Sequence, residues 1–471
     1  MQRVISLILT ISFWANVCSG QSTSKPKDEY FDKSTVIASC PDRVDAEFVP
    51  GQIMVQFAHE SSEHDKQAFA EAFSLTLLKS MDGRMGLQNE SVQRLGDLAL
   101  YKITDNRPFT LESLQKLTRA AEQHPGVRFA EPNWIYRTKA KTSDDDYYNR
   151  GMLWGVYSDD IPHPIGPSGT TSNYGTQVEK AWANDHVGSA DVYVAVVDSG
   201  IQVDHPDLKG NVDVNDGWDF YYNHKPIFDF AEFIHGTHVA GIIGARGGNR
   251  IGVAGMVWNV QLISAKFIGP DGLGNASDAV DAFNFITALK LSGNKQVVVI
   301  NNSWSGYGFS RPLLRAIKAA AEAGIIIVAA ASNECNDNDL HPAFPASYDT
   351  RDASDGTPGL PYNAVLSVAA LDRNGDLPLF SNFGKRSVHL AAPGMDIYST
   401  SPVWTGQSDY QAKSGTSMAA AFVSGAVALY ASSHPSASAK NIIDAILSSV
   451  VPTASLTNKT VTGGRLDVSF F

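Results

Sequence analysis

Short runs of almost wholly apolar residues alternate with helical patterns, and this alternation constrains the fold of the 471-residue chain more than any other feature. The run at 192–197 (Val-Tyr-Val-Ala-Val-Val) is typical of a strand covered on both faces, as the strands of a parallel sheet are. Similar runs lie at 260–267, 297–300, 325–330 and 364–370, and helical patterns lie at 235–245, 277–291, 312–323, 416–432 and 439–449. Residues 151–471 are therefore expected to form an α/β fold, a parallel sheet flanked by helices.

A second, smaller pattern occupies residues 51–137. Strand signals at 52–57, 99–103 and 127–130 enclose helical spacing at 66–80 and 111–123, which predicts a small α+β domain. Residues 21–50 are polar and of mixed charge, and we interpret them as a linker. Residues 138–150 contain Asp144, Asp145 and Asp146 without apolar periodicity, which is typical of an exposed joint open to proteolysis.

The first 20 residues have the pattern of a secretory signal peptide. Arg3 precedes an apolar stretch at 4–14, and small residues at 17–20 offer a cleavage site near Gln21. An N-terminal core helix is the alternative, but polar residues follow at once. No later apolar run reaches the about 18 residues that a membrane span needs. We therefore expect an exported, extracellular protein with no membrane partner.

Charge and cysteine content narrow the classes further. The chain has 37 Lys and Arg against 49 Asp and Glu, a net charge of −12, which argues against a nucleic-acid partner. Three cysteines cannot build a disulfide framework. Cys18 leaves with the signal; Cys40 and Cys335 can pair in the precursor, but their separate domains favour a free Cys335 thiol. Sequons at Asn89, Asn275, Asn301 and Asn458 permit glycosylation in a eukaryotic host.

Three reactive side chains fall where a parallel sheet collects its functional groups, at strand ends and helix starts. Asp198 ends the most apolar strand, while His235 and Ser417 each open a predicted helix. A serine hydroxyl is a weak nucleophile at neutral pH, so it needs a base such as histidine, which a buried carboxylate orients. Ser417 at a helix start points its own N–H at a developing oxyanion, and Asn333, just past the strand at 325–330, supplies a second donor.

Each of these motifs also has a structural interpretation. Asp-Ser-Gly at 198–200 is by itself a strand-to-turn signal, and the small residues around Ser417 let helices pack closely. His235 and His238 share a helix face, but no Glu stands between them as in the zinc motif, so His238 is expected to be a buried structural histidine. Cys335 as an alternative nucleophile lacks a second histidine in an equivalent context.

The three blocks in the order Asp, His, Ser, together with Ala-Ala-Ala-Ser-Asn at 329–333, resemble those of the subtilisin-type serine proteases, peptidase family S8. The resemblance covers residues 154–471, including the segment at 464–468 that is similar to the family's catalytic-domain end. Residues 51–136 resemble the family's inhibitory propeptide. The resemblance implies a subtilisin-like catalytic domain preceded by a ferredoxin-like propeptide domain that acts as an intramolecular inhibitor.

The activity implied by this resemblance is that of a secreted, monomeric serine endopeptidase made as a self-processed zymogen that acts on polypeptides. Ser417 would attack the scissile carbonyl, His235 would transfer the proton, Asp198 would orient His235, and Asn333 would bind the oxyanion. The alternative is a catalytically silent relative that acts as a binding protein. An esterase of another Ser-His-Asp fold is disfavoured because it would have the order Ser, acid, His.

Substrate contacts are also implied by the resemblance. The two docking edges would be Gly272, Leu273 and Gly274, and Ser303, Trp304, Ser305 and Gly306, with Ser332 in the pocket for the residue before the cut. Ser305 and Ser332 stand where the family commonly has glycine, so the size of this pocket is open. Glu334 alone would favour Lys or Arg there only mildly.

A structural calcium ion is the one cofactor that the resemblance implies. Its ligands would be the side chains of Asp207 and Asn249 and the backbone carbonyls of Ile251 and Val253, because all-oxygen ligation on a loop suits Ca²⁺. The length of the loop at 246–253 and its Gly-Gly pair depart from the family pattern. The alternative is an ordinary turn after a helix.

Overall fold

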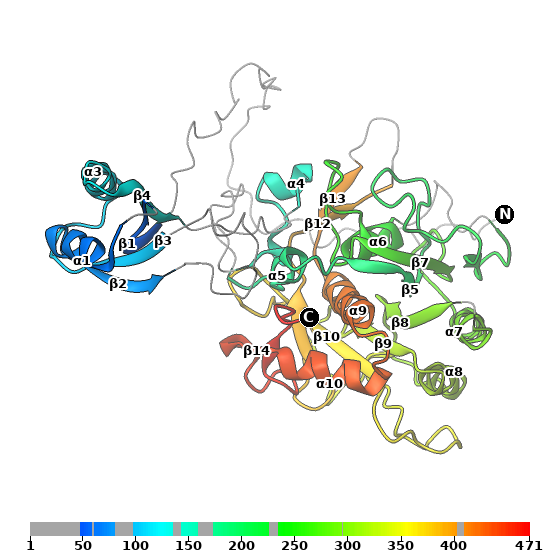
Figure 1. The fold of residues 1–471 in the computed structure, drawn as a ribbon. Coiled ribbons are helices and arrows are strands. Elements are labelled where there is room, and N and C mark those ends of the chain that lie inside the picture. The colour runs from blue at the N-terminus through cyan, green and yellow to red at the C-terminus, as the bar shows by residue number, and fades with distance from the viewer. Residues whose placement is uncertain are drawn as a thin grey trace, which may run out of the picture. The chain divides into compact units, whose positions relative to one another are not determined.

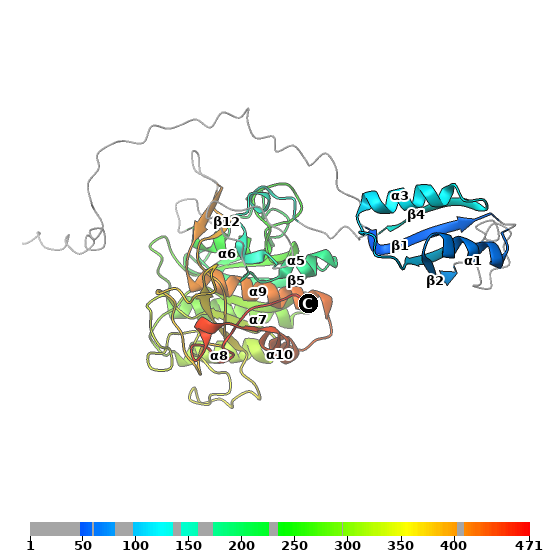
Figure 2. The same cartoon turned by 90° about the vertical axis from the view of Figure 1, so that its left-hand side faces the viewer.

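The computed structural model describes residues 48–58, 61–80, 98–134, 143–158, 173–225, 234–293, 295–402 and 409–471. The chain divides into two compact units, Met1–Thr138 and Lys139–Phe471, which are drawn in Figure 1 and, from a second direction, in Figure 2. The expected signal peptide, most of the linker, Cys40 and the sequon at Asn89 lie outside the described residues.

In its described residues the N-terminal unit has a four-stranded antiparallel sheet and two helices. Its elements are β1 (Phe48–Phe57), α1 (Glu63–Ala72), β2 (Leu75–Ser80), β3 (Leu98–Ile103), α3 (Leu111–Glu122) and β4 (Val127–Trp134). The strand order β2-β3-β1-β4 together with the β-α-β-β-α-β sequence is ferredoxin-like, as expected. Its core contains Ile53 and Val55 from the sheet and Phe69 and Leu114 from the helices.

One element of this unit differs from the sequence analysis, which placed helical spacing over 66–80. Helix α1 ends at Ala72, Ser74 has a positive φ of 55°, and residues 75–80 form β2. The left-handed residue stops the helix, and pairing with β3 then satisfies the backbone of a segment whose Leu77 and Leu78 stay half exposed. The sequence of this strand, Leu-Thr-Leu-Leu-Lys-Ser, lacks the regular alternation of apolar and polar residues by which a strand is predicted.

The C-terminal unit contains a nine-stranded sheet in the order β14-β15-β11-β10-β9-β8-β5-β7-β6. Its strands are β5 (Gly188–Asp198), β6 (Trp218–Asp219), β7 (Asn259–Lys266), β8 (Gln296–Asn302), β9 (Ile326–Ala330), β10 (Val365–Leu371), β11 (Leu390–Pro393), β14 (Val451–Pro452) and β15 (Gly464–Arg465). All neighbours are parallel except β14 and β15. A separate hairpin joins β12 (Ile397–Thr400) to β13 (Tyr410–Lys413).

Helices cover both faces of this sheet, which confirms the interpretation of the apolar runs. Val194 and Val196 of β5 pack into one core with α6 (His235–Gly244), α9 (Thr416–Ser433) and α10 (Ala439–Ser449). Ala195 and Val197 face the opposite core with α7 (Ala276–Leu291) and α8 (Arg311–Glu322). The smaller helices are α4 (Asp146–Asn149) and α5 (Val178–Ala183), with 3₁₀ turns at Trp154–Val156 and Ala454–Leu456.

Strand β5 is the point at which the order of the sheet reverses. The chain passes from β5 to the edge strand β6, returns through α6 to β7 beside β5, and then crosses through α7 to β8 on the other side of β5. Helices α6 and α7 lie on opposite faces of the sheet, in separate cores. Open parallel sheets bind ligands at such a reversal, beyond the carboxyl ends of the strands. Asp198 ends β5 at this position.

Residues 143–158 pack within the C-terminal unit, so the described part of the region 138–150, expected to be an exposed joint, is partly buried. Asp145 is fully buried, and its carboxylate accepts hydrogen bonds of 2.8 to 3.0 Å from the backbone N–H groups of 248–250. The hydroxyl of buried Tyr148 donates to buried Glu179. Polar contacts rather than an apolar stripe hold this segment, so periodicity could not reveal it.

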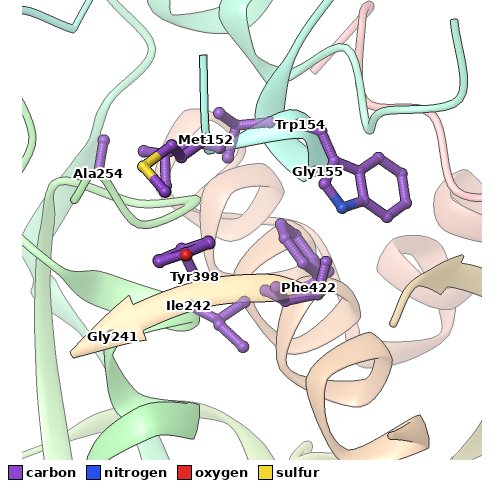
Figure 3. A pocket seen from close by; sticks show the side chains of 11 residues that line it. Met152, Trp154, Gly155, Gly241, Ile242, Ala254, Tyr398 and Phe422 are labelled. Atoms are coloured by element: carbon purple, nitrogen blue, oxygen red, sulfur yellow. The ribbon is translucent and has the colours of Figure 1, made fainter. Parts of the chain in front are cut away.

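Residues 152–156 continue this attachment over the helical layer. Figure 3 shows Met152 and Trp154 on one side of a small apolar pocket, with Tyr398, Ile242 of α6 and Phe422 of α9 on the other. The pocket holds about 10 Å³, and the Trp154 indole N–H donates to the Met395 carbonyl at 3.0 Å. The start of the C-terminal unit is therefore fastened to the helices that carry the candidate catalytic residues.

Within the described part of the chain, one helix, α9, is long and apolar enough to cross a membrane, with a mean hydropathy of 1.2. The C-terminal unit buries 83% of that window. Such burial is typical of the core helix of a globular domain, and a core helix can have the same length and apolar composition as a membrane-spanning one.

Cysteine and glycosylation predictions can be compared with the described residues. Cys335 has a free, exposed thiol. Asn275 and Asn458 are exposed, but Asn301 is fully buried in β8, where its side chain bonds to Ser303 and Ser424. The folded protein therefore offers no access to the sequon at Asn301.

Candidate active site

A buried carboxylate and a histidine ring meet at the end of β5. Nδ1 of His235 lies 2.9 Å from Oδ1 and 3.0 Å from Oδ2 of Asp198. Asp198 is fully buried and also accepts from the Ser199 N–H at 2.7 Å, whereas the His235 side chain is 17% exposed. An ionised carboxylate only accepts hydrogen bonds, so this contact assigns the proton to Nδ1 and makes Nε2 the basic nitrogen of the ring.

Ser417 lies in the first turn of α9, on the same face of the sheet as α6. Its hydroxyl donates to the Ser303 carbonyl at 3.0 Å, and the Ser303 hydroxyl donates back to the Ser417 carbonyl at 3.0 Å. A hydroxyl has a single proton, so in this rotamer Ser417 does not give it to His235. The structure thus shows a direct hydrogen bond between Asp198 and His235, and it shows Ser417 in a rotamer that donates to the Ser303 carbonyl, just after β8.

The side-chain amide of Asn333 has a fixed orientation. Its Oδ1 accepts from the backbone N–H of Thr416 at 2.9 Å and from the Thr416 hydroxyl at 3.0 Å. A backbone N–H can bond only to the oxygen of the amide, so Nδ2 must point away from the helix start as a donor. Because Asn333 is exposed, its Nδ2 donor lies at the surface, beside Thr416 and one residue away from Ser417.

The two expected docking edges line one cleft of about 320 Å³. Gly272, Leu273 and Gly274 form one wall, and Trp304, Ser305 and Gly306 form the other. Trp304 packs edge-on against Phe267 with ring centroids 4.8 Å apart, which makes the base of the cleft apolar. Ser303 lies at the end of β8 beside Ser417, and Ser332 follows β9. An extended peptide can lie between such edges by adding a strand.

Asp207, which precedes α6, contacts the loop after that helix, where the other expected calcium ligands lie. Asp207 accepts from the Asn249 Nδ2 group at 2.9 Å and from the Val253 N–H at 2.8 Å, and the Asn249 Oδ1 accepts from the Ile251 N–H at 2.7 Å. Sequence analysis missed Asp145, whose buried carboxylate acts on Asp207 electrostatically. Three consecutive aspartates, at 144–146, suggest solvent exposure and so concealed the burial of Asp145. In the sequence, only the adjacent Tyr147 and Tyr148 indicate that this segment packs against the domain.

The residue types around Asp207 suit a hard cation, but the contacts that Asp207 makes in this structure come from N–H donors. Burial, with help from the nearby Asp145 charge, raises the pKa of Asp207 to about 7, while hydrogen bonds from Val253 and Asn249 act in the other direction. Two buried carboxylates, an amide oxygen and loop carbonyls are the oxygen ligands that Ca²⁺ takes. The described residues contain no cluster of three or more His, Cys, Asp or Glu suited to a metal. Carbonyl and amide oxygens would therefore have to complete the set, with the Asn249 amide turned.

Comparison with known proteins identifies the family. Residues 189–467 match the Subtilase family, peptidase S8. The chain belongs to this family. Residues 39–133 match the fervidolysin N-terminal prodomain, so the subtilase unit is preceded by a prodomain of that type.

Several proteins are similar to this subtilase. Subtilisin-like protease 2 of Plasmodium falciparum is 36% identical over 268 residues, which are 54% of this chain but only 18% of that protein. The thermophilic serine proteinase of a Bacillus species is 29% identical over 436 residues, 92% of this chain and 90% of that protein. Fervidolysin of Fervidobacterium pennivorans is 26% identical over 92% of this chain and 60% of its own length. A solved protease structure from Pseudoalteromonas arctica superposes with a TM-score of 0.55 at 26% identity, covering 69% of this chain and 97% of that one.

His238, one turn after His235, is the second histidine of the segment His-Gly-Thr-His at 235–238. It is fully buried and its Nε2 lies 3.1 Å from the Gln411 carbonyl. Burial lowers its pKa to about 3. A neutral ring that donates to a carbonyl is a structural contact, and the geometry therefore agrees with the structural interpretation of this residue.

We predict that His238 makes the subtilase sensitive to acid. Below about pH 6.5 the unfolded chain protonates this histidine whereas the folded chain stays neutral down to about pH 3, so the free energy of unfolding rises with pH in that range, by up to about 1.4 kcal/mol per pH unit. In the variant His238→Gln the dependence of the unfolding free energy on pH should be weaker by up to about 1.4 kcal/mol per pH unit, which corresponds to one proton. Denaturant unfolding at several pH values measures it, with exposed His434→Gln as control. Parallel curves for wild type and His238→Gln would contradict the prediction.

Proposed function

We propose that this chain is an exported serine endopeptidase that hydrolyses polypeptides through Asp198, His235 and Ser417 and acts as a monomer. The observation that carries the proposal is the buried hydrogen bond between Asp198 and His235 at the reversal of strand order, in a chain of the subtilase family. Ser417 at the buried start of α9 and the outward donor of Asn333 support the same assignment.

The proposed reaction gives each of these groups one role. The Ser417 side chain rotates away from the Ser303 carbonyl so that its Oγ can meet Nε2 of His235, which takes the proton as Oγ attacks the scissile carbonyl. Asp198 stabilises the imidazolium that forms, and the Ser417 N–H and Asn333 Nδ2 donate to the oxyanion. His235 then protonates the leaving amine. Water repeats the steps to release the acyl group.

The N-terminal unit, by its match to a prodomain, would inhibit the enzyme until it is removed. We place the maturation cut before Ser143, at the N-terminal side of the region 138–150. The reason is that Asp145 and Tyr148 are buried in the C-terminal unit, so a cut after them would strip contacts from the loop at 248–250 and from Glu179.

Replacing Ser417 with Ala should abolish both peptidase activity and maturation. The nucleophile is then missing, so cells should release a precursor that keeps its N-terminal unit, visible by gel and by terminal sequencing. Wild type should yield a mature chain that begins at or before Ser143 and reacts with a sulfonyl fluoride. Normal processing and undiminished peptidase activity in Ser417→Ala would refute the assignment; an unlabelled, inactive wild type would instead favour the silent binding protein.

Replacing Asn333 with Ala should lower kcat by about 10²–10³, the loss seen when a subtilisin loses its oxyanion asparagine and adopted here as the expected magnitude. KM should change little, because the donor acts on charge that develops in the transition state. Thr416→Val serves as control: it leaves the backbone N–H that orients Asn333, while it removes the hydroxyl that donates to Asn333 and accepts from the Ser332 N–H. An equal loss in both variants would show that Asn333 acts by fixing the helix start.

Calcium should stabilise the enzyme through the loop at 246–253. A cation bound by Asp207, Asn249, Ile251 and Val253, with Asp145 as an added ligand, would supply the positive charge that two buried carboxylates need. Excess chelator should then lower the unfolding temperature of the sulfonyl-fluoride-inhibited enzyme, because a ligand held only by the folded state stabilises it by mass action. Calcium-saturated chelator is the control, and Asp207→Asn should no longer respond. Identical melting curves with and without chelator would remove the site.

A further inference from the structure

A buried lysine ends the strand that leads into the cleft. Lys266 is the last residue of β7 and immediately precedes Phe267 and Ile268, which line the cleft. Its side chain is fully buried, and its Nζ lies 2.8 Å from the carboxylate of buried Asp219, the neighbouring residue on β6. Replacing a buried ion pair by apolar residues is often neutral for stability, so stability alone does not account for a pair kept beside the cleft.

Two tyrosine rings surround the ammonium group of Lys266. Its Nζ lies 5.3 Å from the ring centroid of Tyr221 and 4.7 Å from that of Tyr222. An aromatic face attracts a cation, and more strongly where water is excluded. The turn that carries the rings is fixed as well, because the Phe220 N–H donates to the Lys266 carbonyl at 2.6 Å. The Tyr222 N–H donates to the Asp219 carboxylate at 2.9 Å. Lys266 and its partner therefore hold both rings at the end of β7.

Tyr221 in turn lies against the wall of the cleft. Its ring occupies the space beside Gly269 that a side chain would fill, and a Cβ at this position would overlap the ring. Gly269 closes the turn that forms the wall, since its N–H donates to the Leu273 carbonyl at 2.9 Å and its carbonyl accepts from the Gly272 N–H at 3.0 Å. Gly272 and Leu273 line the cleft. A series of contacts thus runs from Lys266 through Tyr221 to Gly269 and the cleft wall.

The two ends of this wall are held differently. At its start, the N–H groups of Phe267 and Ile268 donate to the Asp198 carbonyl at 2.9 and 3.3 Å. At its tip, Leu273 is 67% exposed. The position of the tip therefore depends on Gly269, which is the residue that the Tyr221 ring contacts.

We propose that Lys266 is a positioning residue for substrate binding: its ammonium group holds Tyr221 against Gly269 and so keeps the wall at 272–274 in place for the peptide. The inference rests on the proposed function and names a further residue on which that function depends. A peptide that adds to the wall as a strand needs the backbone groups of the wall in line. A wall that moves would have to be ordered at each binding event, which lowers affinity.

The test separates binding of a long peptide from hydrolysis of a short ester. In the mature double variant Asp219→Asn/Lys266→Met, which leaves no unpaired buried charge, KM for a peptide that spans the cleft should rise about 10-fold, the equivalent of one lost hydrogen bond. Its kcat should change little, because the wall contacts substrate and transition state alike. An ester of a single blocked amino acid, too short to reach the wall, should be hydrolysed as by wild type.

Variants of Tyr221 test the middle of the series of contacts. Tyr221→Ala removes the ring between Lys266 and Gly269 and should raise KM for the long peptide as the double variant does. Tyr221→Phe keeps the ring and should restore most of the affinity. Titration with a sulfonyl fluoride counts the active enzyme in each sample, so that incomplete folding does not enter kcat.

The matched control is a second buried ion pair. Lys318 and Asp355 lie 2.8 Å apart, are equally buried, and are outside the described residues that line the cleft. Lys318→Met/Asp355→Asn should leave KM for the long peptide unchanged. An unchanged KM in the Lys266 double variant, or an equal rise in the Lys318 double variant, would overturn the inference. Failure of the wild type to hydrolyse either substrate and to react with the sulfonyl fluoride would instead refute the proposed function, and the inference with it.

Discussion

The whole site depends on one buried carboxylate. Asp198 is removed from water at the end of β5, and a buried charge is tolerated only where hydrogen bonds replace its hydration. Two donors do so, the Ser199 N–H and the His235 ring, and the second of these fixes the first residue of α6. The reversal of strand order at β5 leaves this end of the sheet open. The same hydrogen bond therefore fixes the position of α6 relative to β5 and orients the histidine ring at the candidate site.

The sheet was predictable because burial on both faces leaves a continuous apolar run in the sequence. Strand β5 and helices α6 to α9 begin and end within a few residues of their predicted positions for this reason. Segments held by polar contacts leave no such record. Strand β2 is defined by a left-handed serine and its pairing with β3, and the segment around Asp145 by backbone donors about a hundred residues away, so both escaped the sequence analysis.

The candidate site shows the same division. Asp198, His235 and Ser417 stand out because strand ends and helix starts mark them, and local pattern suffices for that. The rotamer of Ser417, the direction of the Asn333 amide and the contact between Ser305 and Ser332 join residues from different strands and helices. Sequence analysis noted that Ser305 and Ser332 replace common glycines, but only coordinates show that the two departures touch one another.

Helix α9 carries Ser417 at its first turn and is buried along nearly its whole length. Helix ends usually fray, yet at this end the Thr416 N–H donates to the side-chain Oδ1 of Asn333 and the Ser303 hydroxyl donates to the Ser417 carbonyl. Local opening is therefore unfavourable at the nucleophile, since it would disturb contacts to two strands at once. Thermal inactivation of this enzyme should therefore coincide with unfolding of the entire sheet rather than precede it. The activity that remains after heating then reports the fraction of molecules that are still folded.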